Sequence, residues 1–253
     1  MFAPAELSED GFLGGRLRIA QPKAGYRSAM DAVFLAAACD ACAGQSVLEL
    51  GCGAGVASLC LGARVAGLRQ TGLEVQPRYA ALARANAQSN AMTLEVIEGD
   101  LAEMPADLRA RSFDHIIANP PYFVPQSGTP ATDREREHAL REVTPLALWL
   151  DAGLRRLHPD GMVTLIQQVD RLGDILAGLQ GRAGAITVLP IAPRIGRPAR
   201  RVIVQARKGA RAPLELLAPL IVHGAPQHTR DAEDFSEIAH AILRGGQKLL
   251  IRR

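Results

Sequence analysis

Four consecutive residues, Asn119, Pro120, Pro121 and Tyr122, are of types that suggest chemistry. Asn119 carries a side-chain carbonyl, and Pro120 keeps a backbone carbonyl but has no N–H group to compete for it. Two acceptors held together in a rigid turn can bind both protons of a planar NH2 group while Tyr122 stacks on the ring that carries the amine. Accepting both protons frees the nitrogen lone pair for attack. The alternative is that the segment only ends a strand.

A glycine-rich turn lies earlier in the chain, in the sequence VLELGCGAG. Gly51, Gly53 and Gly55 follow a short apolar run and precede a helical segment, an arrangement that lets a ligand approach main-chain amides. Glu49 lies two residues before the first glycine, where it would repel the pyrophosphate of a dinucleotide. An acid at this place suits a ligand with a cationic ammonium group. By itself, a glycine turn in an α/β protein can be no more than a tight turn.

Two further acids end or follow the next two expected strands. Glu74 ends the second strand, where a carboxylate can accept hydrogen bonds from ribose hydroxyls. Asp100 follows the third strand, where its side chain can accept from an adenine amine beside the backbone of Leu101. Together with Glu49 and the glycines, these acids describe a ligand that has an ammonium, a ribose and an adenine but no phosphates. The series resembles the S-adenosylmethionine site of class I methyltransferases, which implies S-adenosyl-L-homocysteine as the product.

The elements that must position these residues alternate along the chain, which predicts an α/β, Rossmann-like sheet of seven mostly parallel strands with helices on both faces. About ten residues separate the last two strands, so we expect that pair to be antiparallel. A short hairpin is expected around residues 17–21. The expected strands are residues 46–50, 69–75, 93–99, 113–119, 161–168, 185–191 and 201–207. The expected helices are residues 28–42, 56–66, 77–90, 143–157 and 171–179, with a terminal helix within 231–246.

Three segments divide the chain in this interpretation. Residues 1–45 form an N-terminal hairpin and helix that pack on the cofactor site, and residues 46–210 form the catalytic domain. Residues 211–253 form a C-terminal extension within the same single domain. The long polar connection 123–142 is expected to be a substrate lid.

Composition predicts a globular protein, because 48% of the 253 residues are hydrophobic and 22% are charged. The chain shows neither an apolar run of membrane-spanning length nor a secretory signal, so we expect a soluble, cytoplasmic monomer or homodimer that does not bind membranes. Cys39 and Cys42 form a C-x-x-C at the end of an alanine-rich helix, where packing is a better interpretation than redox chemistry. We expect no metal site.

Basic residues are concentrated near the C-terminus. Residues 1–181 have a net charge of −5, whereas residues 182–253 have a net charge of +8. The stretch 192–214 has no acid, which favours contacts with nucleic-acid phosphates over a solvated loop. The expected RNA-binding residues are Arg194, Arg197, Arg200, Arg201, Arg207 and Lys208, with Arg211 in the same stretch.

The combined motifs resemble the N-PP-[YF] methyltransferases, which modify adenine N6, guanine N2 or a glutamine side chain. The glutamine branch has a sizeable helical domain before the glycine turn, whereas only about 45 residues precede it here. The segments QPKAGYRSAMDAVFLAAA, RIGRPARRVIVQARKG and PLELLAPLIVH are similar to bacterial tRNA N6-adenine methyltransferases, which modify the adenine next to the anticodon of a valine tRNA. Asp31 matches an acid near the methionine end of the cofactor in that group, although Met30 stands where a threonine is common.

This resemblance implies methyl transfer to the N6 amine of an adenine in the anticodon-loop region of tRNA, with Asn119, Pro120, Pro121 and Tyr122 as catalytic residues. The alternatives are ribosomal RNA adenine-N6 or guanine-N2 methylation, protein glutamine methylation, an RNA-binding protein without turnover, and a nicotinamide oxidoreductase. The expected cofactor-binding residues are Asp31, Glu49, Gly51, Cys52, Gly53, Gly55, Glu74, Val75, Asp100, Leu101 and Asn119.

Overall fold

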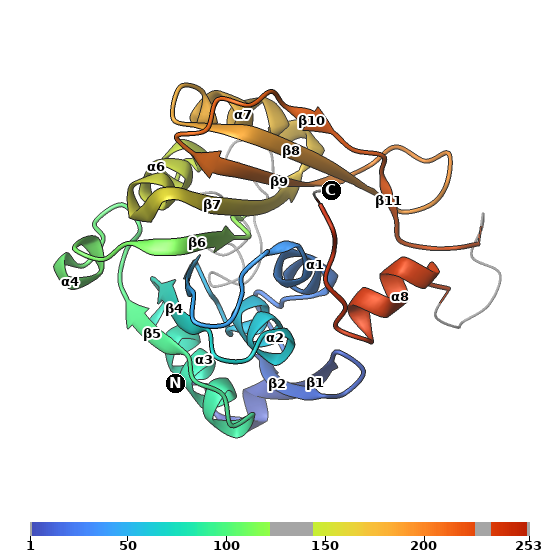
Figure 1. Ribbon diagram of the computed structural model, residues 1–253. Coiled ribbons are helices and arrows are strands. Elements are labelled where there is room, and N and C mark those ends of the chain that lie inside the picture. The colour runs from blue at the N-terminus through green and yellow to red at the C-terminus, as the bar shows by residue number, and fades with distance from the viewer. Residues whose placement is uncertain (1, 122–143, 226–233, 252–253) are drawn as a thin grey trace.

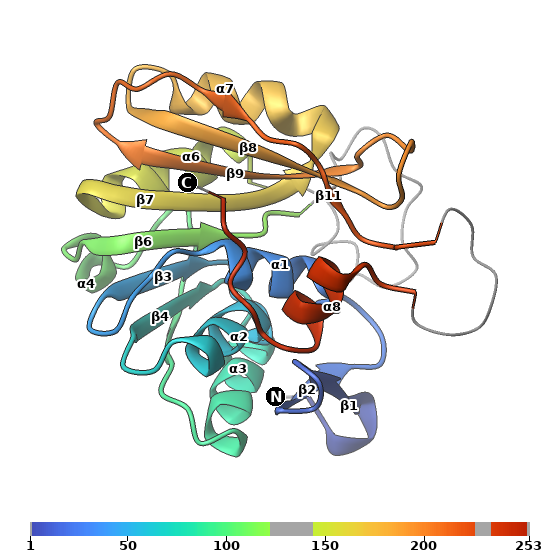
Figure 2. The ribbon, with the colours of Figure 1, turned by 45° about the vertical axis from the view of Figure 1, so that its right-hand side comes forward.

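The computed structural model describes residues 2–121, 144–225 and 234–251. A central sheet is covered by helices on both faces, with a two-stranded hairpin beside it (Figures 1 and 2). The strands are β1 (Leu7–Phe12), β2 (Leu17–Pro22), β3 (Ser46–Leu50), β4 (Arg69–Glu74), β5 (Glu95–Glu98), β6 (Phe113–Ala118), β7 (Leu157–Gln168), β8 (Ala183–Ala192), β9 (Arg201–Lys208), β10 (Glu215–Leu216) and β11 (Leu220–Ile221). The helices are α1 (Met30–Ala38), α2 (Val56–Arg64), α3 (Pro77–Ser89), α4 (Ala106–Arg109), α6 (Leu146–Arg156), α7 (Leu172–Leu179) and α8 (Glu237–Leu243).

The order of the strands in the sheet confirms the expected Rossmann-like fold. The order is β10-β8-β9-β7-β6-β3-β4-β5, with β11 also pairing with β8. Within this sheet, β9 is antiparallel to both β7 and β8, and the other described pairings are parallel. The seven expected strands are β3 to β9, and the two-residue strands β10 and β11 extend the β8 edge.

The central strands are buried on both faces, which explains why they read as continuous apolar runs in the sequence. Neighbouring residues of β6 belong to different cores. Ile116 lies in the cluster that contains Trp149 of α6, whereas Ile117 lies in the cluster formed with α1, α2 and α3. Each core therefore joins one face of the sheet to its own layer of helices.

Two helices have boundaries that differ from the prediction. Ser28 does not cap α1, because its backbone N–H donates to Gln21 Oε1 at 2.7 Å and its carbonyl accepts from Gln21 Nε2 at 3.1 Å. The helix therefore begins at Met30 and ends at Ala38. The helix expected from residue 143 begins at Leu146, because Pro145 occupies the N-cap in an extended conformation.

The C-terminal segment crosses back over the first helix. Ser236 caps α8, accepting from Ala239 N at 3.2 Å, and Leu249 N donates to Ala37 O at 2.9 Å. The terminal helix is thus confirmed within the predicted segment, although it is shorter than that segment. Across the described ranges, no helix combines the length and apolar character needed to span a membrane.

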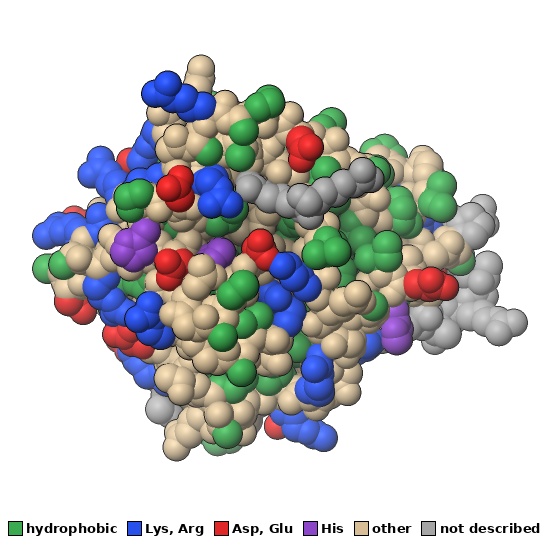
Figure 3. Space-filling model, in the orientation of Figure 1, with side chains coloured by type: hydrophobic (Ala, Val, Ile, Leu, Met, Phe, Trp, Pro, Cys, Tyr) green, Lys and Arg blue, Asp and Glu red, His purple; other side chains and the backbone are tan. Residues whose placement is uncertain are grey.

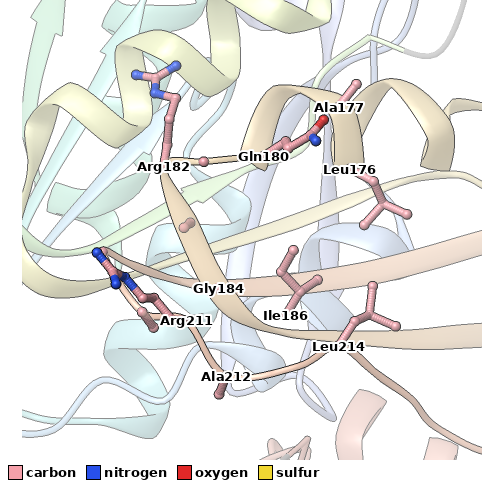
Figure 4. Close-up of a pocket in the computed structure, with 13 residues that line it drawn as sticks. Leu176, Ala177, Gln180, Arg182, Gly184, Ile186, Arg211, Ala212 and Leu214 are labelled. Carbon is pink, nitrogen blue, oxygen red and sulfur yellow. The ribbon is translucent and has the colours of Figure 1, made fainter.

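A hollow of about 870 Å³ lies between α7 and the start of β8 (Figure 4). Leu176, Ile186 and Leu214 line it together with Arg182 and Arg211. Because β8 runs parallel to β7, its start lies at the amino-terminal edge of the sheet. The hollow is therefore remote from the carboxyl ends of β3, β4 and β6, where the predicted site residues lie.

Candidate cofactor and substrate site

The carboxyl ends of three neighbouring strands meet at one edge of the sheet. Leu50, the last residue of β3, is in register with Leu73 of β4 and with Ala118, the last residue of β6. Consequently the glycine turn, Glu74 and Asn119 all emerge at the same level, and in Figure 2 this edge lies on the right. Open α/β sheets bind ligands at such an edge.

The glycine turn depends on conformations that favour glycine. Gly51, Gly53 and Gly55 have φ angles of 66°, 53° and 84°. A Cβ atom on Gly51 would also lie 2.6 Å from the ring of Trp149 in α6, so this position excludes any side chain. Trp149 Nε1 donates to Thr144 O at 3.2 Å, which ties the glycine turn to the residues that precede α6. No pattern in the sequence indicated this support.

Glu74 holds the glycine turn from the neighbouring strand. Its Oε2 accepts from Gly53 N at 2.8 Å, and its Oε1 accepts from Gln76 N at 2.9 Å. Cys52 N donates to Leu73 O at 3.0 Å, and the Cys52 side chain is buried against Gly72. The carboxylate is therefore oriented by backbone donors, which leaves further lone pairs for a ligand hydroxyl.

Glu49 is a buried carboxyl group, with 4% of its surface exposed. Its Oε2 accepts from the backbone N–H of Ser58 at 2.9 Å and from the Ser58 hydroxyl at 2.5 Å. Burial raises the pKa of Glu49 to about 8 despite these hydrogen bonds, and the nearby charge of Glu74 raises it further. A ligand ammonium at this place would add to the contacts with α2.

Tyr26, in the segment between β2 and α1, lies over the glycine turn. A Cβ on Gly53 would be 3.6 Å from its ring. Burial raises the pKa of Tyr26 to about 12, and the carboxylates of Glu49, Asp31 and Glu74 contribute in the same direction. This tyrosine thus lies close to three of the predicted cofactor residues. The sequence interpretation did not select it, although it belongs to the segment GYRSAMD.

The remaining predicted cofactor residues lie around the same edge. Asp100 is exposed and accepts from Ala102 N at 2.8 Å, which fixes a turn after β5. Leu101 is partly buried against the core that contains Trp149. Val75 is 48% exposed and offers an apolar surface directly after Glu74.

Asn119 lies directly after β6, and its Oδ1 atom is buried without a hydrogen-bond partner in the described part of the chain. A buried acceptor of this kind is costly unless a ligand satisfies it. Gln167 Nε2, on the neighbouring strand β7, donates to Pro120 O at 3.2 Å and approaches Pro121 O at 3.5 Å. Gln167 is 1% exposed and was not predicted. Tyr122 and the expected lid at residues 123–142 fall outside the described residues.

The expected basic stretch is divided between two edges of the sheet. Because β9 starts beside the end of β7, Arg194, Arg197, Arg200 and Arg201 lie near the candidate site. Arg207 and Lys208 lie at the other end of β9, where they donate to Asp160 O at 3.0 Å and Leu157 O at 2.7 Å. Arg211 follows them and lines the hollow described above. Figure 3 shows basic side chains mixed with acidic ones along its left side, toward which β9 runs in Figure 1.

Two of the four nearby arginines are engaged by acids. Arg194 pairs with Asp234 at 2.7 Å, and Arg201 Nε donates to Asp31 Oδ2 at 2.6 Å. The side chains of Arg197 and Arg200 are exposed and have no ion-pair or hydrogen-bond partner among the described residues.

Three of the four cysteines take packing positions, whereas the packing expected for Cys42 is wrong, because that residue lies beyond the end of α1 and is exposed. Cys39, Cys52 and Cys60 are buried free thiols, and Cys42 is an exposed one. Across the described ranges, no three His, Cys, Asp or Glu side chains are grouped so that they could hold a metal ion.

Comparison with known proteins identifies the region that contains this site. The family model of the methyltransferase small domain matches residues 29–135, which include the glycine turn, Glu74 and Asn119. This stretch of the chain is therefore similar to the methyltransferase small domain. A predicted O-methyltransferase from Agrobacterium tumefaciens has a similar structure, with a TM-score of 0.71 and 26% identity over 88% of this chain and 99% of that chain.

One further structure and two sequences are also similar to this chain. The 16S rRNA N2 G1207 methyltransferase of T. thermophilus shares the fold, with a TM-score of 0.53 and 19% identity over 80% of this chain and 50% of that one. The tRNA1(Val) (adenine(37)-N6)-methyltransferase of Porphyromonas gingivalis is 34% identical over 136 residues, which are 52% of each chain. The protein of the same name from Dickeya chrysanthemi is 26% identical over 216 residues, 84% of this chain and 85% of that one. The chain thus spans about half the length of the first relative and most of the second.

Proposed function

We propose that this protein transfers the methyl group of S-adenosylmethionine to the N6 amine of an adenine in the anticodon-loop region of tRNA. One observation carries the chemical part of this proposal: the buried, unsatisfied Oδ1 of Asn119 beside the carbonyl of Pro120, at the edge of the sheet that bears the glycine turn. These two oxygens are the acceptors that a planar NH2 group requires.

The residues present fit S-adenosylmethionine. Glu74 is oriented by backbone donors and has lone pairs left for ribose hydroxyls, and Glu49 provides a carboxyl group for the ammonium. The Gly51 and Gly53 backbone allows close approach, and Asp100 with Leu101 and the exposed Val75 flank the place expected for the adenine. When bound, the cofactor supplies a methyl group on a positively charged sulfur, which is already activated for in-line transfer.

The residues of the turn after β6 then position and activate the acceptor amine. Asn119 Oδ1 and Pro120 O accept its two protons, so the nitrogen lone pair turns toward the methyl group. Gln167 donates to Pro120 O, which fixes that carbonyl while leaving its second lone pair available. Tyr122, which lies outside the described residues, is assigned to stack on the base in this proposal. The contribution of the protein is therefore positioning and electrostatics, and the amine proton released after transfer passes to water.

The names of the relatives support an adenine in tRNA as the substrate, since both compared sequences are tRNA1(Val) (adenine(37)-N6)-methyltransferases. A base in an anticodon loop is already largely free of pairing, so it can enter the site at small cost. A tRNA substrate also fits a protein that works in the cytoplasm, and its state as a monomer or homodimer stays a prediction. Ribosomal RNA is the second candidate, because a 16S rRNA guanine-N2 methyltransferase shares the fold.

The test is methylation of purified tRNA and ribosomal RNA with labelled S-adenosylmethionine, followed by nucleoside mass spectrometry. N6-methyladenosine in tRNA is the expected product. Asn119→Ala should lower its formation at least about 100-fold at a saturating concentration of the cofactor. Gln180→Ala, which removes an exposed amide at the remote hollow, is the matched control. N2-methylguanosine or label in protein would contradict the proposed acceptor, and unchanged methylation by Asn119→Ala would contradict the mechanism.

A further inference from the structure

The connection between β8 and β9 projects from the edge of the sheet that bears the candidate site (Figure 2). Its tip is a β-turn in which Arg197 N donates to Arg194 O at 3.1 Å. Gly196 takes the third position with a φ of 72°, as a type II turn requires. Ile195 therefore occupies the second position, at the apex of the turn.

Ile195 is an unusual residue for this place. Its side chain is 76% exposed, more than that of any other large hydrophobic residue in the described ranges. A Cβ added to the neighbouring Gly196 would meet no atom within 4 Å, so the apex is open on that side. Proline is common at this position of a type II turn. Turn stability therefore does not account for an exposed isoleucine here.

The residues before and after the turn form the two legs of this connection. Both legs are anchored to the rest of the fold, so the apex is held on a rigid support. On one leg, Arg194 pairs with Asp234 at 2.7 Å, and Pro193 O accepts from His223 N at 2.9 Å. Hydrogen bonds from Arg194 and His223 hold the pKa of Asp234 below its ordinary value, although burial alone would raise it.

The other leg is tied to two elements of the site. Arg200 O accepts from Val169 N at 3.1 Å, directly after β7, and Arg201 pairs with Asp31 of α1. The anchors therefore hold the apex in a fixed relation to β7, which carries Gln167, and to the start of α1.

The charges beside the apex identify the kind of partner. Arg197 and Arg200 follow Ile195 in the same connection, are exposed, and have no ion-pair partner among the described residues. A polyanion satisfies both arginines through its phosphates, and an aliphatic side chain in the same connection fits the face of a base. Nucleic-acid-binding proteins use isoleucine, leucine and phenylalanine in this way, as wedges that separate stacked bases.

We infer that Ile195 is an unstacking wedge, which separates the target adenine from its neighbour in the RNA while Arg197 and Arg200 hold the adjacent phosphates. This inference rests on the proposed RNA substrate. It adds a role that the acceptor turn cannot perform, because a stacked base must leave its neighbours before its amine can reach Asn119.

The test compares two RNAs with the full-length protein. One is an anticodon stem-loop with 2-aminopurine beside the target adenine, and the other is a short oligonucleotide without stable stacking. When the wild-type protein and S-adenosylhomocysteine are added to the stem-loop, the fluorescence of 2-aminopurine should rise. It should not rise when the Ile195→Ser variant is added at a concentration that saturates the stem-loop. Methylation of the stem-loop by Ile195→Ser should fall about tenfold, whereas methylation of the short oligonucleotide should change less than about twofold. Leu216→Ser removes a 68% exposed side chain from β10 and serves as the control.

The outcomes separate this inference from the proposed function. Equal losses on both RNAs, or full fluorescence with saturating Ile195→Ser, would overturn the wedge. If the wild-type protein methylates no RNA but Ile195→Ser still abolishes the fluorescence rise, the wedge stands and the proposed reaction fails. If Ile195→Ser changes only the oligomeric state or binding to a protein, the surface serves a protein partner and the inference is wrong.

Discussion

Arg201 Nε donates to Asp31 Oδ2 at 2.6 Å, so a residue predicted to bind RNA is joined to a residue predicted to bind the cofactor. The Asp31 side chain is 14% exposed and that of Arg201 is 42% exposed. Arg201 is the first residue of β9, directly after the β8–β9 connection, and Asp31 lies in the first turn of α1. The contact therefore links the connection proposed to bind RNA to the predicted cofactor site.

Replacing Arg201 should affect the cofactor more than the RNA. In Arg201→Ala, Asp31 loses the partner that orients it, so we expect the Kd for S-adenosylmethionine to rise about fivefold. The salt dependence of RNA binding should stay as in the wild type. Calorimetry with the cofactor and salt titrations with RNA measure both quantities. A flattened salt dependence with unchanged cofactor affinity would show that Arg201 binds phosphate instead.

Arg197 and Arg200 should behave in the opposite way. Each phosphate contact contributes about one unit to the slope of log Kobs against log salt concentration. Arg197→Ala and Arg200→Ala should each lower that slope by about one and leave cofactor affinity unchanged. Arg207→Ala and Lys208→Ala are matched controls, because these side chains bind backbone carbonyls at the opposite edge. Equal effects of all four substitutions would argue for diffuse attraction and against a defined phosphate site.

Glu49 should make the stability of the cofactor-free protein depend on pH. Burial raises its pKa from 4.5 to about 8, so the folded state binds a proton that the unfolded state releases. This contribution is fully present below pH 4.5 and is lost as the pH rises toward 8, on the order of a few kcal/mol. His115 acts in the opposite direction, because burial lowers its pKa.

Urea unfolding at several pH values between 4.5 and 8.5 tests this contribution. The difference in unfolding free energy between the wild type and Glu49→Gln should fall across this window. Glu215→Gln, at an exposed position on β10, is the control substitution. A constant difference for Glu49→Gln would show that the pKa of Glu49 is the same in the folded and unfolded states.

Gly51→Ala should destabilise the protein by both backbone strain and overlap with Trp149. Gly44 is the matched control, because its φ of 84° is also left-handed but a Cβ there meets no atom within 4 Å. We expect about 1 kcal/mol for Gly44→Ala and about 2–4 kcal/mol for Gly51→Ala, since overpacking adds to the strain. Chemical denaturation measures both. Equal losses would mean that Trp149 moves away at no cost.

The alternation of strands and helices made the fold and the edge of the site predictable. Strands buried on both faces are continuous apolar runs, and parallel strands place their carboxyl ends together. Glu74 and Asn119 were therefore assigned to one edge without knowledge of any contact. Periodicity does not specify side-chain partners that are distant in sequence. Trp149 and Gln167 contact the two functional turns from other elements, so neither could be selected from its local sequence.

The basic stretch shows a second limit of sequence interpretation. Seven cations within residues 192–214 suggested one surface. However, β9 spans Arg201 to Lys208 and carries its last two cations to the far edge of the sheet. An extended strand rises about 3.3 Å per residue, so the two ends of β9 lie too far apart to contribute to one RNA contact. A basic stretch of sequence therefore predicts a single basic surface only when the element that joins its two ends is compact.

Gln167 should be a positioning residue for methyl transfer. Its Nε2 donates to Pro120 O, and its Oε1 accepts from Gln168 N at 2.8 Å, so the side chain is fixed at both ends. Gln167→Leu removes the donor, and the Pro120 carbonyl then loses its orientation toward the amine. We expect kcat to fall at least about tenfold while the KM for the cofactor stays within about twofold.

Gln205 provides the matched control for this substitution. It is a buried glutamine on β9 that donates to Ala38 O at 2.7 Å, away from the acceptor turn. Both Gln167→Leu and Gln205→Leu leave a buried carbonyl without a donor, so both should lower the unfolding free energy by about 1–3 kcal/mol. Only Gln167→Leu should lower kcat at a temperature where both variants are folded. A similar loss of kcat in both would mean that kcat follows general stability, and Gln167 would then have no specific role in presenting Pro120.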